Sequence, residues 1–344
     1  MSPTTATIII SSLATGTIIT ASSHHWLMAW IGLEMNTLAI IPMISKQHHP
    51  RATEAATKYF LTQAAASAMI FFSSTLNAWL MGTWDIMNST NPTANMLLTM
   101  ALAMKLGLAP VHFWLPEVLQ GSTMKTAMII TTWQKLAPMA LIYQTFNNLS
   151  TTALLTVGLI SATLGGWAGL NQTQTRKIMA FSSIAHLGWM AAITTILPNI
   201  LLLNLMIYLL MTTSMFYTLI LLNSKNIKDL ATSWTTSPSI TATTMLILLS
   251  LGGLPPLTGF MPKWLILEEL TTQNLTVMAT SMAMSALLSL FFYLRLTYSS
   301  TITLSPNTTT VTHKWRFKQA PSTLLLSLTL PTSTLMLPLT PMLC

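Results

Sequence analysis

The sequence predicts an all-α, polytopic membrane protein of about eleven transmembrane helices, arranged as two inverted five-helix repeats with broken helices. Three observations predict this fold class. Charged residues make up only 6% of the chain and hydrophobic residues 52%, at a mean hydropathy of +0.60, a composition that excludes a soluble domain of this length. Apolar runs of about 20 residues, the length that crosses the hydrocarbon core, recur along the chain. One motif interrupted by glycine and proline occurs twice.

The apolar runs predict the order of the spans. No basic region precedes the first run and no small-residue cleavage pattern follows it, so we expect a retained span. The rule of about 20 residues per span places transmembrane helices at residues 4–20, 26–44, 55–80, 94–118, 124–145, 149–170, 175–197, 199–223, 240–267, 276–299 and 321–342.

The fourth span contains the first interruption. Residues 105–117 read KLGLAPVHFWLPE, in which Gly107, Pro110 and Pro116 follow a lysine. Proline removes a backbone donor and clashes with the preceding turn, so we expect the helix to break here. A broken helix at membrane depth is tolerated only where protein or a water-filled cavity satisfies the freed backbone groups. The motif therefore predicts a hydrated interior, which His112 borders.

The ninth span repeats this pattern. Residues 253–263 read GLPPLTGFMPK, with breaks expected at Pro255, Pro256 and Pro262. The offset from the first motif is constant, since 253 − 107 and 263 − 117 both equal 146. Two helix-breaking segments at corresponding positions of two halves indicate a transporter site. A chance match of two Gly/Pro-rich loops is the alternative.

Charge placement predicts the orientation and the domains. If spans alternate sides, the connections with Lys46/Arg51, Lys125, Arg176/Lys177, Lys225/Lys228 and Lys314/Arg316/Lys318 share one face. We therefore expect the N-terminus on the basic, matrix-like side and the C-terminus on the other. Five spans per repeat is an odd number, so the repeats must be inverted. The predicted domains are residues 1–146, 147–300 and 301–344, the last holding a loop and the final helix.

Four charged residues lie well inside predicted spans: Glu34, Lys105, Lys135 and Lys263. Each carries an insertion cost of about 2.5–3.5 kcal/mol at the centre of a helix. Lys135 lies about ten residues, roughly 15 Å, from either interface, too far for its side chain to reach water. Such residues usually have a partner or a task. For Lys263, which is closer to one side, a side chain extended to the interface is the alternative.

Glu34 and Lys105 are the predicted switching pair. Burial disfavours the charged form of an amine and a nearby carboxylate favours it, so a movable carboxylate lets a lysine hold or release a proton. A static ion pair that fixes two helices is the alternative. His186, near the middle of the seventh span, is suited to proton relay, although a histidine bonded to a neighbouring helix explains it equally well.

Several classes of cofactor and partner are excluded or restricted. The single cysteine, Cys344, excludes internal disulfides, thiolate-held iron–sulfur clusters and zinc fingers. The histidine doublets at 24–25 and 48–49 lack accompanying carboxylates, so we expect them at the interface and not on a metal. The net charge of +8 lies mostly in connections and predicts no nucleic-acid surface. Residues 313–318, HKWRFK, are expected against anionic lipid headgroups, with a partner subunit as the alternative.

The chain resembles the antiporter-like proton-pumping subunits of respiratory complex I, which are related to subunits of multisubunit sodium/proton antiporters. The resemblance covers essentially the whole chain and depends on residues 30–36 (WIGLEMN), 104–117 (MKLGLAPVHFWLPE), 133–138 (WQKLAP) and 252–264 (GGLPPLTGFMPKW). It implies a relay in which Glu34 pairs with Lys105, Lys135 is central, Lys263 is distal and His186 connects the two halves along a hydrated axis.

The resemblance further implies a subunit of NADH:ubiquinone oxidoreductase that translocates protons across the mitochondrial inner membrane. FMN, iron–sulfur clusters and ubiquinone would be bound by partner subunits, and neighbouring antiporter-like subunits and lipids such as cardiolipin would contact this chain. The chain itself would hold no redox cofactor and no metal. A content of 25 methionines, with many threonines, is typical of a chain encoded inside a mitochondrion.

Other functions stay open on the sequence. A free-standing cation/proton antiporter would work without partner subunits. A scaffold subunit would use its buried charges only to fix helix register. A transporter of the secretory pathway would carry glycans at the sequons that begin at Asn88, Asn148 and Asn274.

Overall fold

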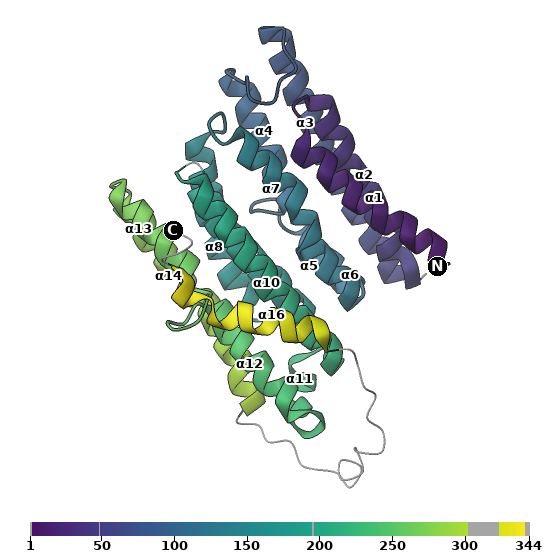
Figure 1. Cartoon of the computed structure of the whole chain (residues 1–344), viewed down its shortest axis with the longest axis vertical. Coiled ribbons are helices and arrows are strands. Elements are labelled where there is room, and N and C mark those ends of the chain that lie inside the picture. The colour runs from purple at the N-terminus through teal and green to yellow at the C-terminus, as the bar shows by residue number, and fades with distance from the viewer. Residues whose placement is uncertain (1, 48, 195, 302–322, 341–344) are drawn as a thin grey trace. The chain divides into compact units, whose positions relative to one another are not determined.

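The computed structural model describes residues 2–47, 49–194, 196–301 and 323–340 (Figure 1). Within these ranges the chain is helical and contains no strand, only isolated bridges between His25 and Asp85 and between Gln174 and Asn226. The basic segment at 313–318 and Cys344 lie outside the described residues.

The helices of the first part follow the predicted order. They are α1 (Pro3–Ser22), α2 (Trp26–Ile44), the short 3-10 helix η1 (Ser45–Gln47), α3 (Pro50–Met81), α4 (Pro92–Leu106), α5 (Trp114–Gly121), α6 (Met124–Thr131), α7 (Trp133–Thr145) and α8 (Thr151–Gly169). The predicted span 94–118 is thus two helices, as expected from its motif. The span 124–145 is also divided, at Thr132, which the sequence did not indicate.

The later helices are α9 (Thr175–Ile193), α10 (Pro198–Leu222), α11 (Ile227–Thr236), α12 (Pro238–Gly252), α13 (Phe260–Thr272), α14 (Thr276–Thr301), α16 (Leu324–Leu335) and η3 (Leu337–Leu339). Helix α11 was not predicted, because its sequence is polar. Asp229 stabilises its first turn. The Asp229 carboxylate accepts hydrogen bonds from the backbone N–H groups of Lys225, at 2.8 Å, and Asn226, at 2.9 Å.

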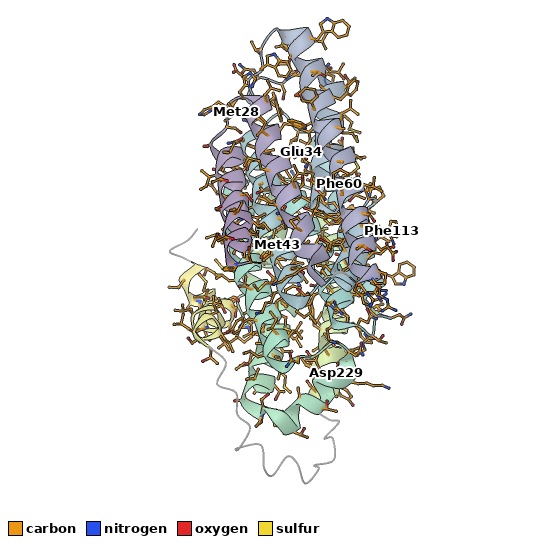
Figure 2. The ribbon with its side chains drawn as sticks, turned by 90° about the vertical axis from the view of Figure 1, so that its right-hand side faces the viewer. Met28, Glu34, Met43, Phe60, Phe113 and Asp229 are labelled. Atoms are coloured by element: carbon orange, nitrogen blue, oxygen red, sulfur yellow. The ribbon has the colours of Figure 1, made fainter. Side chains whose placement is uncertain are left out.

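Six of the described helices, α1, α2, α3, α8, α10 and α14, are long and apolar enough to cross a membrane by length and composition. Large apolar side chains point away from the protein: Phe60, Phe113 and Met28 are 45%, 70% and 55% exposed (Figure 2). In a membrane such side chains face lipid or another subunit. The all-helical class is confirmed, whereas the number of spans stays a prediction.

The chain divides into two compact units, one formed by residues 1–161 and 187–198 and the other by residues 162–186 and 199–344. In the first unit α1 packs on α2, α2 on α3, and α3 on both α4 and α5. In the second, α14 packs on α11, α12 and α13, and α16 packs on α12.

A glycine-rich segment of α8, residues 165–169, packs closely in the second unit. A Cβ atom at Gly165 would lie 2.7 Å from the backbone nitrogen of Ala185, and one at Gly166 would lie 2.8 Å from Cβ of Leu288. No larger side chain fits at either position without a shift. This stretch therefore serves close helix packing.

Candidate functional site: buried lysines at two broken helices

At the first break, the last backbone carbonyl of a helix has no hydrogen-bond partner within that helix. Helix α4 ends at Leu106, and Gly107 adopts the left-handed conformation, with φ of 76°, that turns the chain out of the helix. Helix α5 begins only at Trp114, with Pro110 and His112 in the connection. The carbonyl of Leu106 accepts a hydrogen bond of 2.5 Å from Nζ of Lys135, which comes from α7.

The second break has the same local structure. Helix α12 has the 15-residue length of α4, Gly253 also has φ of 76°, and α13 begins at Phe260. The first residue of the helix, the left-handed glycine and the first residue of the next helix all keep the predicted offset, since 238 − 92, 253 − 107 and 260 − 114 equal 146. Here Nζ of Lys263 donates to the carbonyl of Gly252 at 2.9 Å.

The prolines of the two motifs occupy two kinds of position. Pro110, Pro255 and Pro256 lie in the connections between the half-helices. Pro116 and Pro262 instead lie at the third position of α5 and α13. The first backbone N–H groups of a helix have no intrahelical acceptor, so a proline there costs no hydrogen bond. These two prolines therefore sit inside a new helix and do not interrupt one.

The two lysines are held by the same physical interaction. The last carbonyl groups of a helix carry the negative end of its dipole, which favours a cation. Lys135 is 1% exposed and Lys263 is 9% exposed, so the carbonyl replaces water as a partner for each. Lys135 also lies 5.4 Å from the ring centroid of Trp114, a second favourable contact for an ammonium group.

The predicted switching pair makes no direct contact. Lys105 is 4% exposed, and its Nζ has no hydrogen-bond partner among the described residues. The carboxylate of Glu34 accepts a hydrogen bond of 3.0 Å from Thr37. Glu34 is near enough to Lys105 to act on it electrostatically, yet no ion pair joins them within the described ranges. Any proton exchange between them needs an intermediary or a movement.

His186 and Lys263 lie in the second unit. His186 is 7% exposed, its ring centroid is 5.8 Å from that of Tyr208 on α10, and Lys263 is near enough to act on it electrostatically. In the first unit, His112 is 4% exposed and its Nδ1 has no partner among the described residues. The structure thus brings Glu34, Lys105 and Lys135 together in one unit, and His186 and Lys263 in the other.

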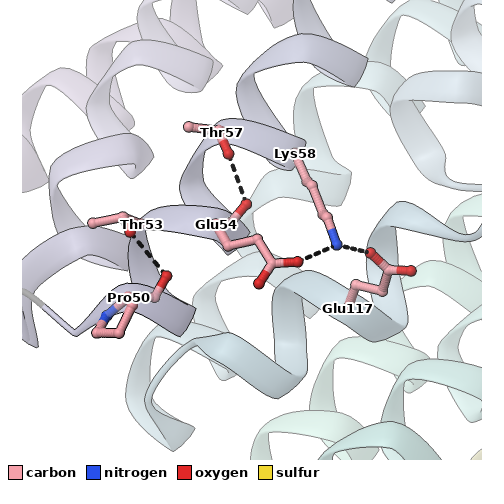
Figure 3. Close-up of polar contacts among 6 residues, drawn as sticks. All are labelled: Pro50, Thr53, Glu54, Thr57, Lys58 and Glu117. Carbon is pink, nitrogen blue, oxygen red and sulfur yellow. Dashed lines mark hydrogen bonds and ion pairs between the residues drawn. The ribbon is translucent and has the colours of Figure 1, made fainter.

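A charged cluster that the sequence did not indicate lies on the surface of the first unit (Figure 3). Nζ of Lys58 contacts Glu54 at 2.5 Å and Glu117 at 2.6 Å, and the three side chains are 41%, 60% and 50% exposed. Exposed pairs contribute little to stability, so the cluster mainly connects α3 to α5.

A second unpredicted contact involves Arg295 of α14. Its guanidinium donates to the carbonyl of Leu170 and, at 2.5 Å, to the carbonyl of Gln172. These carbonyls directly follow α8, so Arg295 caps the end of that helix. No local sequence pattern marks a contact over 125 residues.

Known protein families match the chain along most of its length. The family model described as NADH:quinone oxidoreductase/Mrp antiporter, TM matches residues 23–289, and the model of the NADH dehydrogenase subunit 2 C-terminus matches residues 290–344. NADH-ubiquinone oxidoreductase chain 2 of Xenopus laevis is 58% identical over 342 residues, 99% of each chain. That of Oncorhynchus mykiss is 58% identical over 341 residues, 99% of this chain and 98% of the relative.

Solved structures share the fold. A chain of respiratory complex I from Thermus thermophilus matches with a TM-score of 0.81 and 27% identity, over 96% of this chain and 78% of that one. A chain of the Mrp complex from a Dietzia species matches with a TM-score of 0.80 and 15% identity, over 87% of this chain and 61% of that one. The second likeness shows the fold alone.

Proposed function

The chain belongs to the NADH:quinone oxidoreductase/Mrp antiporter family, within which its relatives are NADH-ubiquinone oxidoreductase chain 2 proteins, and we propose that its buried lysines carry the proton path of this subunit. It is a core membrane subunit of respiratory complex I, and that complex transfers electrons from NADH to ubiquinone while protons cross the membrane. The chain is a multi-pass protein of the mitochondrial inner membrane.

The observation that supports the path is a buried lysine on the last carbonyl of a broken helix in each unit. In the first unit the proton-carrying groups are Glu34, Lys105 and Lys135. In the second unit they are His186 and Lys263. The connections with Gly107, Pro110 and His112, and with Pro255 and Pro256, end α4 and α12 so that their last carbonyl groups can accept from the lysines, while Pro116 and Pro262 lie in the first turn of the helices that follow.

Redox chemistry takes place in partner subunits, which bind FMN, the iron–sulfur clusters and ubiquinone. A chain whose single cysteine is Cys344 has no thiolate set for a cluster. Coupling therefore reaches this chain through charge and conformation at its contacts with other complex I subunits, among them neighbouring antiporter-like subunits. Lipids such as cardiolipin cover the remaining surface.

The arrangement in the membrane is part of the same proposal. Eleven spans form two inverted repeats, at residues 1–146 and 147–300, followed by the segment 301–344. The matching lengths and constant offset of the two broken helices support this arrangement. The distribution of lysine and arginine supports an N-terminus on the matrix side and a C-terminus on the intermembrane side.

The test is substitution of Lys135 or Lys105 by methionine in the assembled complex, reconstituted in liposomes. Both variants should reduce proton pumping and NADH-driven ubiquinone reduction together, while the complex still assembles. Lys125→Met, an exposed lysine on α6, is the matched control and should change neither rate. Unchanged pumping and turnover in both buried-lysine variants would exclude the proposed path.

The free-standing antiporter is the second candidate, because the matching family also includes Mrp antiporter proteins. Such a protein would exchange a cation for protons when purified alone in liposomes. If transport instead appears only with the other complex I subunits present, the antiporter candidate is excluded.

A further inference from the structure

The second broken helix is held by a third helix. Helix α16 packs on α12, and the hydroxyl of Thr258, in the connection between α12 and α13, donates a hydrogen bond to the backbone carbonyl of Ser333 on α16. The Thr258 side chain is fully buried and Ser333 is 1% exposed, so bulk water does not replace either partner. The proposed proton path assigns no role to Thr258.

The acceptor of this bond is again a carbonyl at the end of a helix. Helix α16 ends at Leu335, so the carbonyl of Ser333 lies in its last turn and has no donor within the helix. A buried carbonyl without a partner costs free energy. Thr258 supplies the partner from a position 75 residues earlier in the sequence. The bond therefore fixes the connection after α12 to a helix that follows much later in the chain.

The same connection lies directly against the end of α12. A Cβ atom at Gly259 would overlap the backbone carbonyl of Ser250, so this glycine packs on the α12 backbone. The side chain of Lys263 crosses Gly253, because a Cβ atom there would lie 2.8 Å from Nζ and 3.0 Å from Cδ of the lysine. Its Nζ reaches the Gly252 carbonyl at 2.9 Å. The connection, the lysine and the last turn of α12 are thus in close contact, and a shift of one moves the others.

Thr258 also lies at the start of the helix that carries the lysine. Its backbone carbonyl accepts a hydrogen bond of 3.2 Å from the N–H group of Met261, in the first turn of α13, and Lys263 follows two residues later. The first break has the same backbone bond, from Leu115 to His112. The side chains differ, since Nδ1 of His112 has no partner among the described residues, whereas the Thr258 hydroxyl is bonded to α16. The hydroxyl contact is therefore a feature of the second break and not part of the shared backbone conformation.

We propose that Thr258 is a positioning residue for Lys263. Its bond to the Ser333 carbonyl holds the connection between α16 and the end of α12, so that α13 starts at the place from which Lys263 reaches the Gly252 carbonyl. Without the hydroxyl, α13 can shift and the lysine loses its fixed contact. Thr258 does not itself carry the proton. The inference rests on the proposed function, in which Lys263 is a proton-carrying group of the second unit.

The test compares substitutions in the assembled complex, reconstituted in liposomes, with proton pumping expressed per assembled complex. Thr258→Val keeps the size of the side chain and removes the hydroxyl, and should lower pumping about fivefold, equivalent to about 1 kcal/mol in the barrier. Thr258→Ser keeps the hydroxyl and should retain most of the rate. Thr244→Val is the matched control and should retain the wild-type rate. Thr244 is 2% exposed on α12, and its hydroxyl donates within its own helix, to the carbonyl of Thr241 at 2.7 Å.

The conservative variant and the control decide between a positioning role and a structural one. Pumping lowered in Thr258→Val and retained in Thr258→Ser and Thr244→Val supports the positioning role. Equal losses in Thr258→Val and Thr258→Ser overturn it, because the methyl group and not the hydrogen bond would then matter. The same loss in Thr244→Val also overturns it, since any buried hydroxyl would then matter. If Thr258→Val lowers the yield of complex without changing pumping per complex, or prevents assembly, Thr258 is structural and the inference is overturned.

Lys263→Met separates this inference from the proposed function. Unchanged pumping in Thr258→Val, with pumping lost in Lys263→Met, overturns the positioning role alone. Unchanged pumping in Lys263→Met overturns the role of this lysine in the proposed function as well.

Discussion

Replacing Lys135 by methionine should remove a function while leaving the fold almost equally stable. Methionine has a similar length and no charge, so it fills the space beside Trp114 without contacting the Leu106 carbonyl as a donor. This expectation separates a proton carrier from a scaffold residue, since a lysine kept only to fix helix register would be needed for assembly.

The magnitude follows from the contacts of Lys135. Its hydrogen bond to the Leu106 carbonyl, 2.5 Å long and assisted by charge, is worth about 1.5–3 kcal/mol. The Trp114 ring, 5.4 Å away, contributes about 0.5–2 kcal/mol. These favourable contacts are opposed by the free energy of placing a lysine at the centre of a membrane helix, about 2.5–3.5 kcal/mol. Methionine has no such insertion cost. The two sides are of similar size, so the net change in stability should stay within about 2.5 kcal/mol.

The assay is the amount of complex on native gels and its half-life at elevated temperature, compared with wild type and with Lys125→Met. We expect similar amounts and half-lives for all three, with pumping lost only in Lys135→Met. If Lys135→Met fails to assemble while Lys125→Met assembles, the lysine is structural and the reasoning is refuted.

Two further predictions concern residues outside the proton path. Arg295→Met should lower the yield of assembled complex, because it removes two charge-assisted hydrogen bonds worth about 1.5 kcal/mol or more each. Proton pumping per assembled complex should stay unchanged. Arg295→Lys should recover part of the yield. Gly259→Ala should prevent assembly, because its Cβ would lie 1.7 Å from the carbonyl oxygen of Ser250. Gly82→Ala is its control: Gly82 has φ of 70° and no heavy atom within 4 Å of the added Cβ, so only left-handed strain of about 1–2 kcal/mol is expected there. Equal yields of Gly259→Ala and Gly82→Ala would contradict the packing argument.

The broken helices could be predicted from sequence because their cause is local. Gly107 and Gly253 adopt a conformation that favours glycine, and Pro110 removes a donor within the same connection. A duplicated pattern of such residues therefore identifies both breaks without any long-range information. The burial of Lys105 and Lys135 was also predictable, because an apolar run of known length fixes how far a residue lies from its ends.

The partners of these residues could not be predicted, because they depend on packing. Lys135 reaches a carbonyl 29 residues earlier, and Arg295 reaches one 125 residues earlier. No periodicity or spacing encodes such distances. The predicted span 124–145 is likewise divided at Thr132, six residues before Pro138, so the proline in this span does not mark the position of the break.

The two breaks have the same backbone conformation, but the charged residues at corresponding positions differ. This difference affects how relatives should be compared. With the offset of 146 that aligns the two breaks, Lys263 corresponds in sequence to Glu117, an exposed residue whose carboxylate forms an ion pair with Lys58. The first break therefore cannot use its own following helix to supply the cation, and Lys135 of α7 supplies it instead. A helix interior offers no free carbonyl, whereas each break offers one at its last turn, and a lysine from any nearby helix can occupy it. The feature to compare between halves and between relatives is thus a lysine that donates to the last carbonyl of the broken helix. An alignment of lysine positions alone would not detect this feature.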